Sequence, residues 1–285
     1  SKYQYRKVNF IFMKRSIITF VYLSLLSVVF LHAAKVDTIS VHSPSMDKEI
    51  KAAVILPDGY SADKNYPVVY LLHGYSGNFR NWVNDNPGTK DLADQYNTIV
   101  VCPDGAFSSW YWDSPVDETM RFETFVSKEL IEHIDSAYKT IASRNGRAIT
   151  GLSMGGHGGL YLGFRHQDVF GACGSMSGGV DIRPFPNEWE MHKRIGRQAE
   201  NPQNWEDYTV MNQLHLLTPN STRIIFDCGT NDFFYDVNVR LHEELKYRNI
   251  PHDFISRPGN HDMNYWSNAV KYQFLFFSTM FEQTR

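Results

Sequence analysis

The chain has 285 residues, of which 42% are hydrophobic, and its formal net charge at pH 7 is −3. This length and composition allow one large folded domain with a sizeable hydrophobic core. The slightly negative balance, without a basic run in the domain, gives no electrostatic support for a nucleic acid or an anionic surface as a partner.

The N-terminal segment predicts export. Residues 1–12 precede the first methionine, and we interpret them as upstream extra sequence outside the fold. Lys14 and Arg15, an apolar run over 16–31 and small residues at 33–34 are typical of a signal peptide spanning 13–34. The run is short for a membrane span, which needs about 20 residues, and an uncleaved anchor is the alternative. We therefore expect a periplasmic or secreted domain over 35–285, without membrane attachment after cleavage.

From residue 35 onward, strand-like apolar segments alternate with helical patterns. The sequence predicts an antiparallel start over 36–43 and 49–56, then strands near 68, 99–102, 148, 173–177, 224 and 254. It predicts helices over 119–137, 156–165, 237–248 and 263–280. This alternation indicates an α/β fold with a mostly parallel central sheet and helices on both faces. The long polar segment 181–221 is either a lid or pocket wall inserted in the domain, or a pair of surface helices.

The residues around 151–155 have the form of a nucleophile elbow. Gly151-Leu152-Ser153-Met154-Gly155 fits the pattern G-x-S-x-G, with a short strand before it and a glycine-rich helix after it. A sharp strand-to-helix turn strains the serine backbone and exposes its Oγ. Small residues are needed there because the strand and the helix nearly touch. The pattern therefore predicts Ser153 as the nucleophile of an acyl-transfer reaction.

Two further residues are expected to activate this serine. A serine hydroxyl needs a base to take its proton and a third group to orient that base. Asp232 follows one predicted strand and His261 follows the next, in the Ser–Asp–His order of α/β-hydrolases. We predict His261 as the general base and Asp232 as its orienting carboxylate. The alternative base is His252, which precedes its strand. The alternative acids are Asp227, which lies at the end of a strand, and Asp236 and Asp262, which resemble helix caps.

Two backbone amides should stabilise the oxyanion that forms during acyl transfer. One belongs to the residue after the nucleophile, Met154, and the other comes from a loop after an earlier strand. The strand predicted at 67–72 runs into the loop 73–77, where Gly74 allows a turn that aims the Tyr75 amide at the serine.

Five motifs follow one another along the chain, at residues 70–77, 101–105 with 109–115, 151–158, 227–232 and 259–262. Together they resemble the putative esterase (esterase D-like) family, which contains feruloyl and acetylxylan esterases, S-formylglutathione hydrolases and antigen 85 mycolyltransferases. The resemblance spans roughly residues 47–281. It implies an α/β-hydrolase fold, ester hydrolysis through an acyl-serine, no metal or organic cofactor, and Tyr75 as the second oxyanion donor. The chain departs from the family at Asn260 and Met263, where members often carry glycine and tryptophan.

Aromatic residues in loops are the candidates for substrate binding. Trp110 and Trp112 follow the turn at 104–105, and Trp189 lies in the segment 181–221. Aromatic faces near the serine would suit a sugar ring or a phenolic acyl group, so we predict these three as substrate-binding. We expect His157 to pack or to form hydrogen bonds rather than to act in catalysis. The odd, sparse cysteines do not suggest a disulfide framework or a zinc site, and we expect them to be buried apolar residues, namely Cys102, Cys173 and Cys228.

These observations predict an exported serine carboxylic-ester hydrolase that removes acetyl or feruloyl groups from carbohydrate, its partner being the ester substrate. One alternative is an acyltransferase to a sugar hydroxyl. A second is a thioesterase like S-formylglutathione hydrolase, which export disfavours. A third is a non-catalytic carbohydrate-binding protein, which the intact triad disfavours. The sequence leaves the oligomeric state open.

Overall fold

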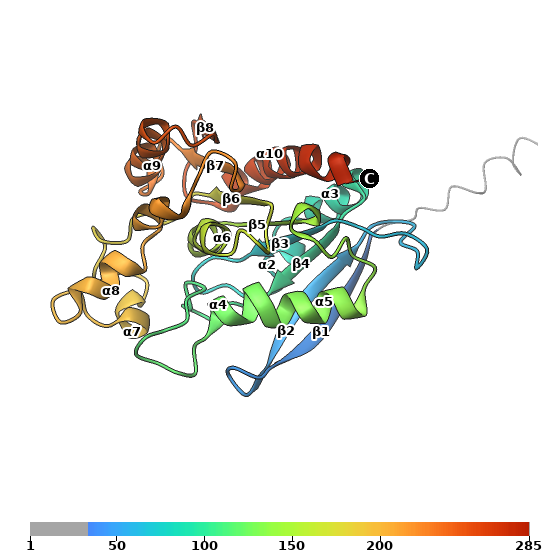
Figure 1. Cartoon of the computed structure of the whole chain (residues 1–285), viewed down its shortest axis with the longest axis horizontal. Helices are drawn as coiled ribbons and strands as arrows, with labels where there is room; N and C mark the ends of the chain where they lie inside the picture. The colour runs from blue at the N-terminus through green and yellow to red at the C-terminus, as the bar shows by residue number, and fades with distance from the viewer. Residues whose placement is uncertain (1–33, 285) are drawn as a thin grey trace, which may run out of the picture. The chain divides into compact units, whose positions relative to one another are not determined.

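The strands form one twisted eight-stranded sheet in the computed structural model, which describes residues 34–284 (Figure 1). The spatial order is β1-β2-β4-β3-β5-β6-β7-β8. β1 pairs with β2 and β2 with β4 in antiparallel fashion, and all the other pairs are parallel. The strands are β1 (Lys35–Ser43), β2 (Lys48–Leu56), β3 (Val68–Leu72), β4 (Ile99–Pro103), β5 (Arg147–Gly151), β6 (Ala172–Met176), β7 (Arg223–Gly229) and β8 (Asp253–Arg257). The predicted α/β-hydrolase fold is confirmed, whereas the predicted signal peptide and upstream residues lie outside the described residues, apart from Ala34.

The helices come close to their predicted positions. Those expected over 119–137, 156–165, 237–248 and 263–280 are present, and the first contains a π-helical stretch. Two short helices that begin beside turn-like residues were not predicted, α2 (Asn81–Asn84) and α3 (Gly88–Tyr96). The others are α4 (Phe122–Thr124), the π-helix η1 (Phe125–Glu129), α5 (Leu130–Ala137), α6 (Met154–Arg165), α7 (Met191–Ile195), α8 (Pro202–Asp207), α9 (Tyr235–Tyr247) and α10 (Met263–Phe281), with 3-10 turns η2 (Arg144–Gly146), η3 (Val210–Asn212), η4 (Leu214–Leu216) and η5 (Glu282–Thr284).

The sheet separates two hydrophobic cores because successive side chains of a strand point to opposite faces. In β3, Val68, Tyr70 and Leu72 enter one core, and Val69 and Leu71 enter the other. The first core is covered by α4–α6, α9 and the segment 181–221, and the second by α2, α3 and α10 (Figure 1). Both faces of every central strand are therefore buried, as the continuous apolar runs of the sequence predict.

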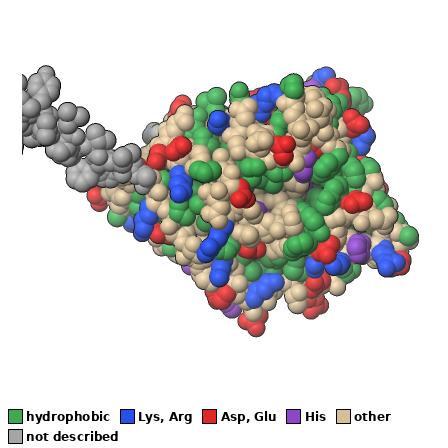
Figure 2. Space-filling view, turned by 180° about the vertical axis from the view of Figure 1, so that it is seen from behind, with side chains coloured by type: hydrophobic (Ala, Val, Ile, Leu, Met, Phe, Trp, Pro, Cys, Tyr) green, Lys and Arg blue, Asp and Glu red, His purple; other side chains and the backbone are tan. Residues whose placement is uncertain are grey.

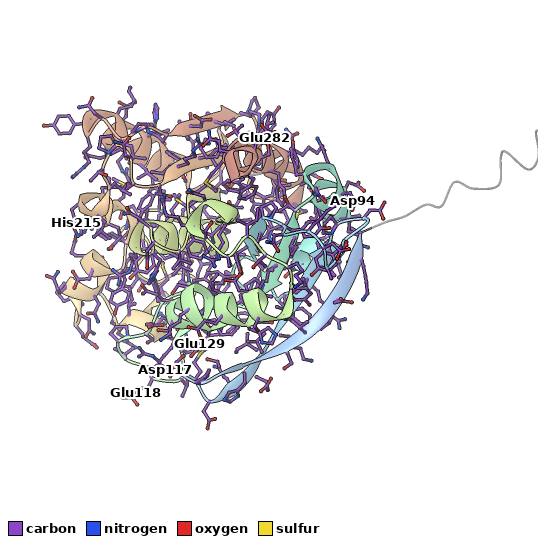
Figure 3. All side chains as sticks on the ribbon, turned by 45° about the vertical axis from the view of Figure 1, so that its right-hand side comes forward. Asp94, Asp117, Glu118, Glu129, His215 and Glu282 are labelled. Atoms are coloured by element: carbon purple, nitrogen blue, oxygen red, sulfur yellow. The ribbon has the colours of Figure 1, made fainter. Side chains whose placement is uncertain are left out.

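The antiparallel hairpin is fastened to the helix that crosses beneath it. Glu129, at the end of η1, accepts hydrogen bonds from Ser43 Oγ at 2.6 Å and from the Ser45 amide at 2.8 Å (Figure 3). These contacts join residues more than eighty positions apart in the chain and fix the edge of the sheet that lies farthest from β8.

The surface carries both signs of charge. On the face seen in Figure 2, acidic and basic side chains are interspersed, and hydrophobic side chains gather beside a hollow. Within residues 34–284 no helix is both long and apolar enough to cross a membrane. The three cysteines are buried and unpaired, as expected.

Candidate active site

Ser153 occupies a strained turn between β5 and α6. Its backbone has φ 54° and ψ −115°, a combination that a non-glycine residue rarely adopts. A Cβ at Gly151 or Gly155 would lie 2.6 or 2.5 Å from the Leu72 carbonyl oxygen. Glycine is therefore required on both sides because the elbow presses against the end of β3. This geometry is that of a nucleophile elbow, in which the serine Oγ is lifted above the sheet.

The structure brings the three predicted triad residues together. His261 Nδ1 lies 2.8 Å from Asp232 Oδ2, and His261 Nε2 lies 2.8 Å from Ser153 Oγ. A carboxylate can only accept, so Nδ1 carries the proton and Nε2 accepts the hydrogen bond of the serine hydroxyl. This tautomer is the one that a general base needs.

The loops that carry the acid and the base are joined to each other. The Thr230 and Asn231 amides donate to the carbonyl oxygens of Arg257 and Gly259 at 2.9 and 3.0 Å. The Asp232 side chain is fully buried, and its Oδ1 accepts a hydrogen bond from the Phe234 amide at 2.8 Å. The carboxylate is thus held by two donors, and it can fix the orientation of the imidazole.

The alternative residues lie elsewhere. His252 pairs with His242 Nδ1 at 2.8 Å and with the Ile250 carbonyl, at the opposite end of β8 from His261. Asp227 is buried within β7, where Arg257 and the Tyr265 hydroxyl bind it, and burial raises the pKa of its carboxyl. Asp236 is exposed in the first turn of α9, and Asp262 caps α10 by accepting from the Tyr265 amide.

The two predicted oxyanion donors lie beside the serine. A Cβ at Gly74 would come within 3.4 Å of Ser153 Cβ, so the loop 73–77 lies directly against the elbow. The amides that follow in this loop are engaged, Ser76 with the Phe107 carbonyl and Gly77 with the Gly74 carbonyl. No hydrogen bond from the amides of Tyr75 or Met154 to another described residue is present. Both amides therefore stay the candidate oxyanion donors.

A cavity of about 440 Å³ opens over the triad. One wall is polar and formed by the loop 73–77 and α2, and the other is aromatic. The lining residues are Gly74, Tyr75, Ser76, Gly77, Asn81, Asp85, Leu152, Ser153, Trp189, Phe233, His261, Met263 and Trp266. A site with an apolar wall and a few convergent polar groups is typical of small-molecule binding.

Trp110 and Trp112 do not line this cavity, so that part of the prediction is wrong. Their exposed fractions are 1% and 0%, and both rings pack edge-on against His157. Their indole nitrogens donate to the carbonyl oxygens of Trp189 and Tyr208, at 3.2 and 3.1 Å. They are buried because the segment 181–221 covers them, and their contact with the site is indirect.

Trp189 does line the cavity, together with a neighbour that the sequence did not reveal. Its ring stacks on Phe233 with centroids 5.5 Å apart and planes 20° apart, and the Phe233 ring lies 4.2 Å from the His261 ring. Phe233 directly follows Asp232 in the sequence, and this position next to a predicted triad residue could have identified it as a candidate for the cavity wall. Trp266 was also missed. Trp266 lies in α10, and its ring meets the His261 ring edge-on with the centroids 4.9 Å apart. It comes three residues after Met263, the position at which family members often carry tryptophan.

The segment 181–221 combines features of both predicted forms. It contains the short helices α7 and α8 and two 3-10 turns, and it places Trp189 in the cavity wall. His157 is buried and contacts the carbonyl oxygens of Trp110 and Tyr208, in agreement with a packing role. Among residues 34–284, no group of three or more His, Cys, Asp or Glu side chains could hold a metal ion.

Comparison with known proteins places the chain among esterases. The profile of the family described as "Putative esterase" matches residues 43–277. The chain is 36% identical over 136 residues to Esterase MT1326 of Mycobacterium tuberculosis, a match that covers 46% of this chain but 29% of that protein. The chain thus spans less than a third of the length of that relative.

Two relatives and one solved structure align over most of their length. The acetyl esterase of Caldicellulosiruptor saccharolyticus is 26% identical over 75% of this chain and 84% of its own. The diacylglycerol acyltransferase/mycolyltransferase Ag85B of Mycolicibacterium smegmatis is 32% identical over 83% of this chain and 82% of its own. A ferulic acid esterase structure superposes with a TM-score of 0.74 and 28% identity, over 87% of this chain and 99% of that one. The chain therefore belongs to the putative esterase family of α/β-hydrolases.

Proposed function

We propose that this protein is an exported serine esterase that removes acetyl or feruloyl groups from carbohydrate. The observation that carries the proposal is the continuous chain of hydrogen bonds from Asp232 through His261 to Ser153, at the floor of an open cavity. A binding protein would have no need for a preformed proton relay at a strained serine.

The proposed reaction has two halves. Ser153 Oγ attacks the ester carbonyl carbon while His261 Nε2 takes the hydroxyl proton, and the amides of Tyr75 and Met154 hold the oxyanion. The tetrahedral intermediate collapses, and His261 returns the proton to the leaving alcohol. A water molecule, deprotonated by the same nitrogen, then attacks the acyl-serine. The second tetrahedral intermediate collapses as His261 returns the proton to Ser153 Oγ, which frees the serine and releases the carboxylic acid.

The cavity supports an acyl group with a flat ring. Trp189 and Phe233 form an aromatic wall beside His261, and such a wall favours a phenolic ring or a sugar face. The similarity to an acetyl esterase and to a ferulic acid esterase supports the same substrate class. Export rests on the N-terminal segment predicted as a signal peptide.

A second function is supported by the similarity to an acyltransferase of the same family. Here a sugar hydroxyl would replace water in the second half of the reaction, with the same acyl-serine. Product analysis with an added acceptor sugar separates the two: transfer products support the acyltransferase, and free acid alone supports the esterase.

The proposal is tested with a substrate panel of methyl ferulate, acetylated xylan and p-nitrophenyl acetate. We expect turnover of at least one carbohydrate-type ester by the wild type, a loss of about 10⁴-fold or more in kcat for Ser153→Ala, and labelling of Ser153 by a fluorophosphonate. Turnover of p-nitrophenyl acetate alone would contradict the carbohydrate assignment. A wild type without turnover or labelling would contradict an esterase altogether.

A further inference from the structure

The triad does not touch the groups that hold the oxyanion loop, residues 73–77, in place. An amide donor stabilises a developing negative charge only when its position is fixed before the reaction. The loop begins at the end of β3 and contacts the elbow through Gly74. Besides the hydrogen bond from the Ser76 amide to the Phe107 carbonyl, two buried residues outside the cavity lining contact the backbone of this loop through their side chains.

His73 is the first of these residues. Its side chain is 1% exposed, and its Nε2 accepts a hydrogen bond from the Gly105 amide at 2.8 Å. The proton of the neutral ring therefore sits on Nδ1, which donates to the Gly74 carbonyl at 2.7 Å. Burial lowers the pKa of His73, so the ring stays in this neutral form. The ring thus links the oxyanion loop to the turn after β4.

Tyr111 is the second. It is fully buried, and its hydroxyl donates to the His73 carbonyl at 3.0 Å. Its ring fills the space that two glycines leave: a Cβ at Gly105 or at Gly158 of α6 would lie 2.5 Å from its ring atoms. The ring is therefore wedged between the turn after β4 and the elbow helix, directly below the oxyanion loop.

The backbone around Tyr111 is itself strained. Trp110 and Tyr111 have φ values of 53° and 59°, in the left-handed region that bulky residues avoid. The Ser109 hydroxyl stabilises this turn by accepting from the Tyr111 amide at 3.0 Å. Strain of this kind persists where the surrounding structure holds it, and it often has a functional reason. Here it turns the tyrosine ring inward, toward the His73 carbonyl.

We propose that Tyr111 is a positioning residue for catalysis, which with His73 braces the oxyanion loop so that the Tyr75 amide keeps its place beside Ser153. This inference rests on the proposed acyl-serine reaction. The hydroxyl of Tyr111 does not meet the substrate. It acts through the His73 carbonyl on the loop that carries the donor.

The test compares Tyr111→Phe with Tyr70→Phe. Tyr70 lies in β3, is equally buried, and its hydroxyl has no hydrogen-bond partner among the described residues, so it is a matched control. We expect Tyr111→Phe to lower kcat for p-nitrophenyl acetate about tenfold, because a displaced donor stabilises the oxyanion less well. KM should stay within about twofold, since acylation and deacylation slow together. Tyr70→Phe should keep the kcat of the wild type.

Hydrogen exchange provides a readout that does not depend on turnover. The Ser76 and Gly77 amides are hydrogen-bonded within and beside the loop, and their exchange should speed up in Tyr111→Phe but not in Tyr70→Phe. Complete fluorophosphonate labelling of Ser153 in both variants would show that the triad is still folded.

Equal kcat and equal loop exchange in the two variants would overturn the role of Tyr111. A general loss of folding in Tyr111→Phe, with incomplete labelling and a proportional loss of active enzyme, would also overturn it, because the residue would then be structural only. Failure of the esterase proposal looks different: the wild type itself would show neither turnover nor labelling.

Discussion

At the scale of single residues, proton placement decides what the site can do. His261 can accept the serine proton only because Asp232 holds the other nitrogen in the protonated form, through a 2.8 Å contact with its fully buried carboxylate. A neutral amide at the same position can donate instead of accept, and it would favour the opposite tautomer.

We therefore expect Asp232→Asn to lower kcat by roughly 10³- to 10⁴-fold with little change in the melting temperature. Asp236→Asn is the matched control, because Asp236 lies four residues away and is exposed on α9. Steady-state kinetics on p-nitrophenyl acetate measures both. A loss below tenfold in Asp232→Asn, or an equal loss in Asp236→Asn, would contradict the assignment of the carboxylate.

At the scale of elements, the elbow helix α6 is joined to the loops around it by one buried histidine. His157 lies among Trp110, Trp112 and Tyr161 and contacts carbonyl oxygens of two separate segments. Burial lowers its pKa from 6.5 to about 4, because a charge in this aromatic surrounding is poorly solvated.

The lowered pKa of His157 makes the stability of the fold depend on pH. Between pH 6.5 and about 4 the unfolded chain binds a proton at His157 and the folded chain does not. The contribution of this histidine to the free energy of unfolding is therefore fully present at pH 7 and is lost as the pH falls from 6.5 toward 4. The loss is on the order of 3 kcal/mol. In His157→Gln the free energy of unfolding should depend less steeply on pH over this range.

Urea titrations at pH 7.0 and 5.0 measure this dependence. His73 and His242 also have lowered pKa values, so the wild-type slope contains their contributions as well. His215→Gln, at an exposed histidine, is the surface control for the substitution itself (Figure 3). An unchanged slope in His157→Gln would show that folding does not alter the proton affinity of this histidine.

The segment 181–221 acts at the same scale, as a wall of the cavity. Its backbone is held by the indole nitrogens of Trp110 and Trp112, and its Trp189 ring lines the cavity, where it stacks on Phe233. Trp110 thus contributes to the site by holding the backbone of Trp189, whereas Trp112 holds that of Tyr208.

We expect Trp189→Ala to raise KM for methyl ferulate about tenfold and KM for p-nitrophenyl acetate less than twofold, because only the larger acyl group reaches the aromatic wall. Tyr247→Ala serves as the control, since Tyr247 is 84% exposed and does not line the cavity. Equal changes for the two esters would indicate that the ring does not select the acyl group.

At the scale of the whole molecule, charged side chains are spread over the surface, but one of them lines the active cavity. Acidic and basic side chains are interspersed on the face shown in Figure 2, and the net charge is only −3. Among the described residues that line the cavity, Asp85 is the one Asp, Glu, Lys or Arg, and Asn81 donates to it at 2.6 Å. This carboxylate should disfavour substrates that carry negative charge, including glutathione thioesters.

We expect Asp85→Asn to raise kcat/KM for the anionic ester p-nitrophenyl hemisuccinate about threefold at low salt, with no change for neutral p-nitrophenyl butyrate. The gain should shrink in 0.5 M salt, where charges are screened over roughly 4 Å. Asp91→Asn, an exposed carboxylate on α3 outside the cavity, is the control. A parallel gain for both esters would argue against an electrostatic cause.

The sequence alone was enough to predict the fold class, the order of the strands along the chain and the three residues that meet below the cavity. It could do so because Ser153, Asp232 and His261 each follow a strand, and the carboxyl ends of parallel strands meet at one edge of a sheet. Which aromatic residues face the cavity depends instead on contacts between segments that are distant in the chain. Trp112 is buried under Tyr208, 96 residues away in the chain, whereas Phe233 and Trp266 flank the base. Burial depends on partners brought together by folding, and no local pattern encodes them.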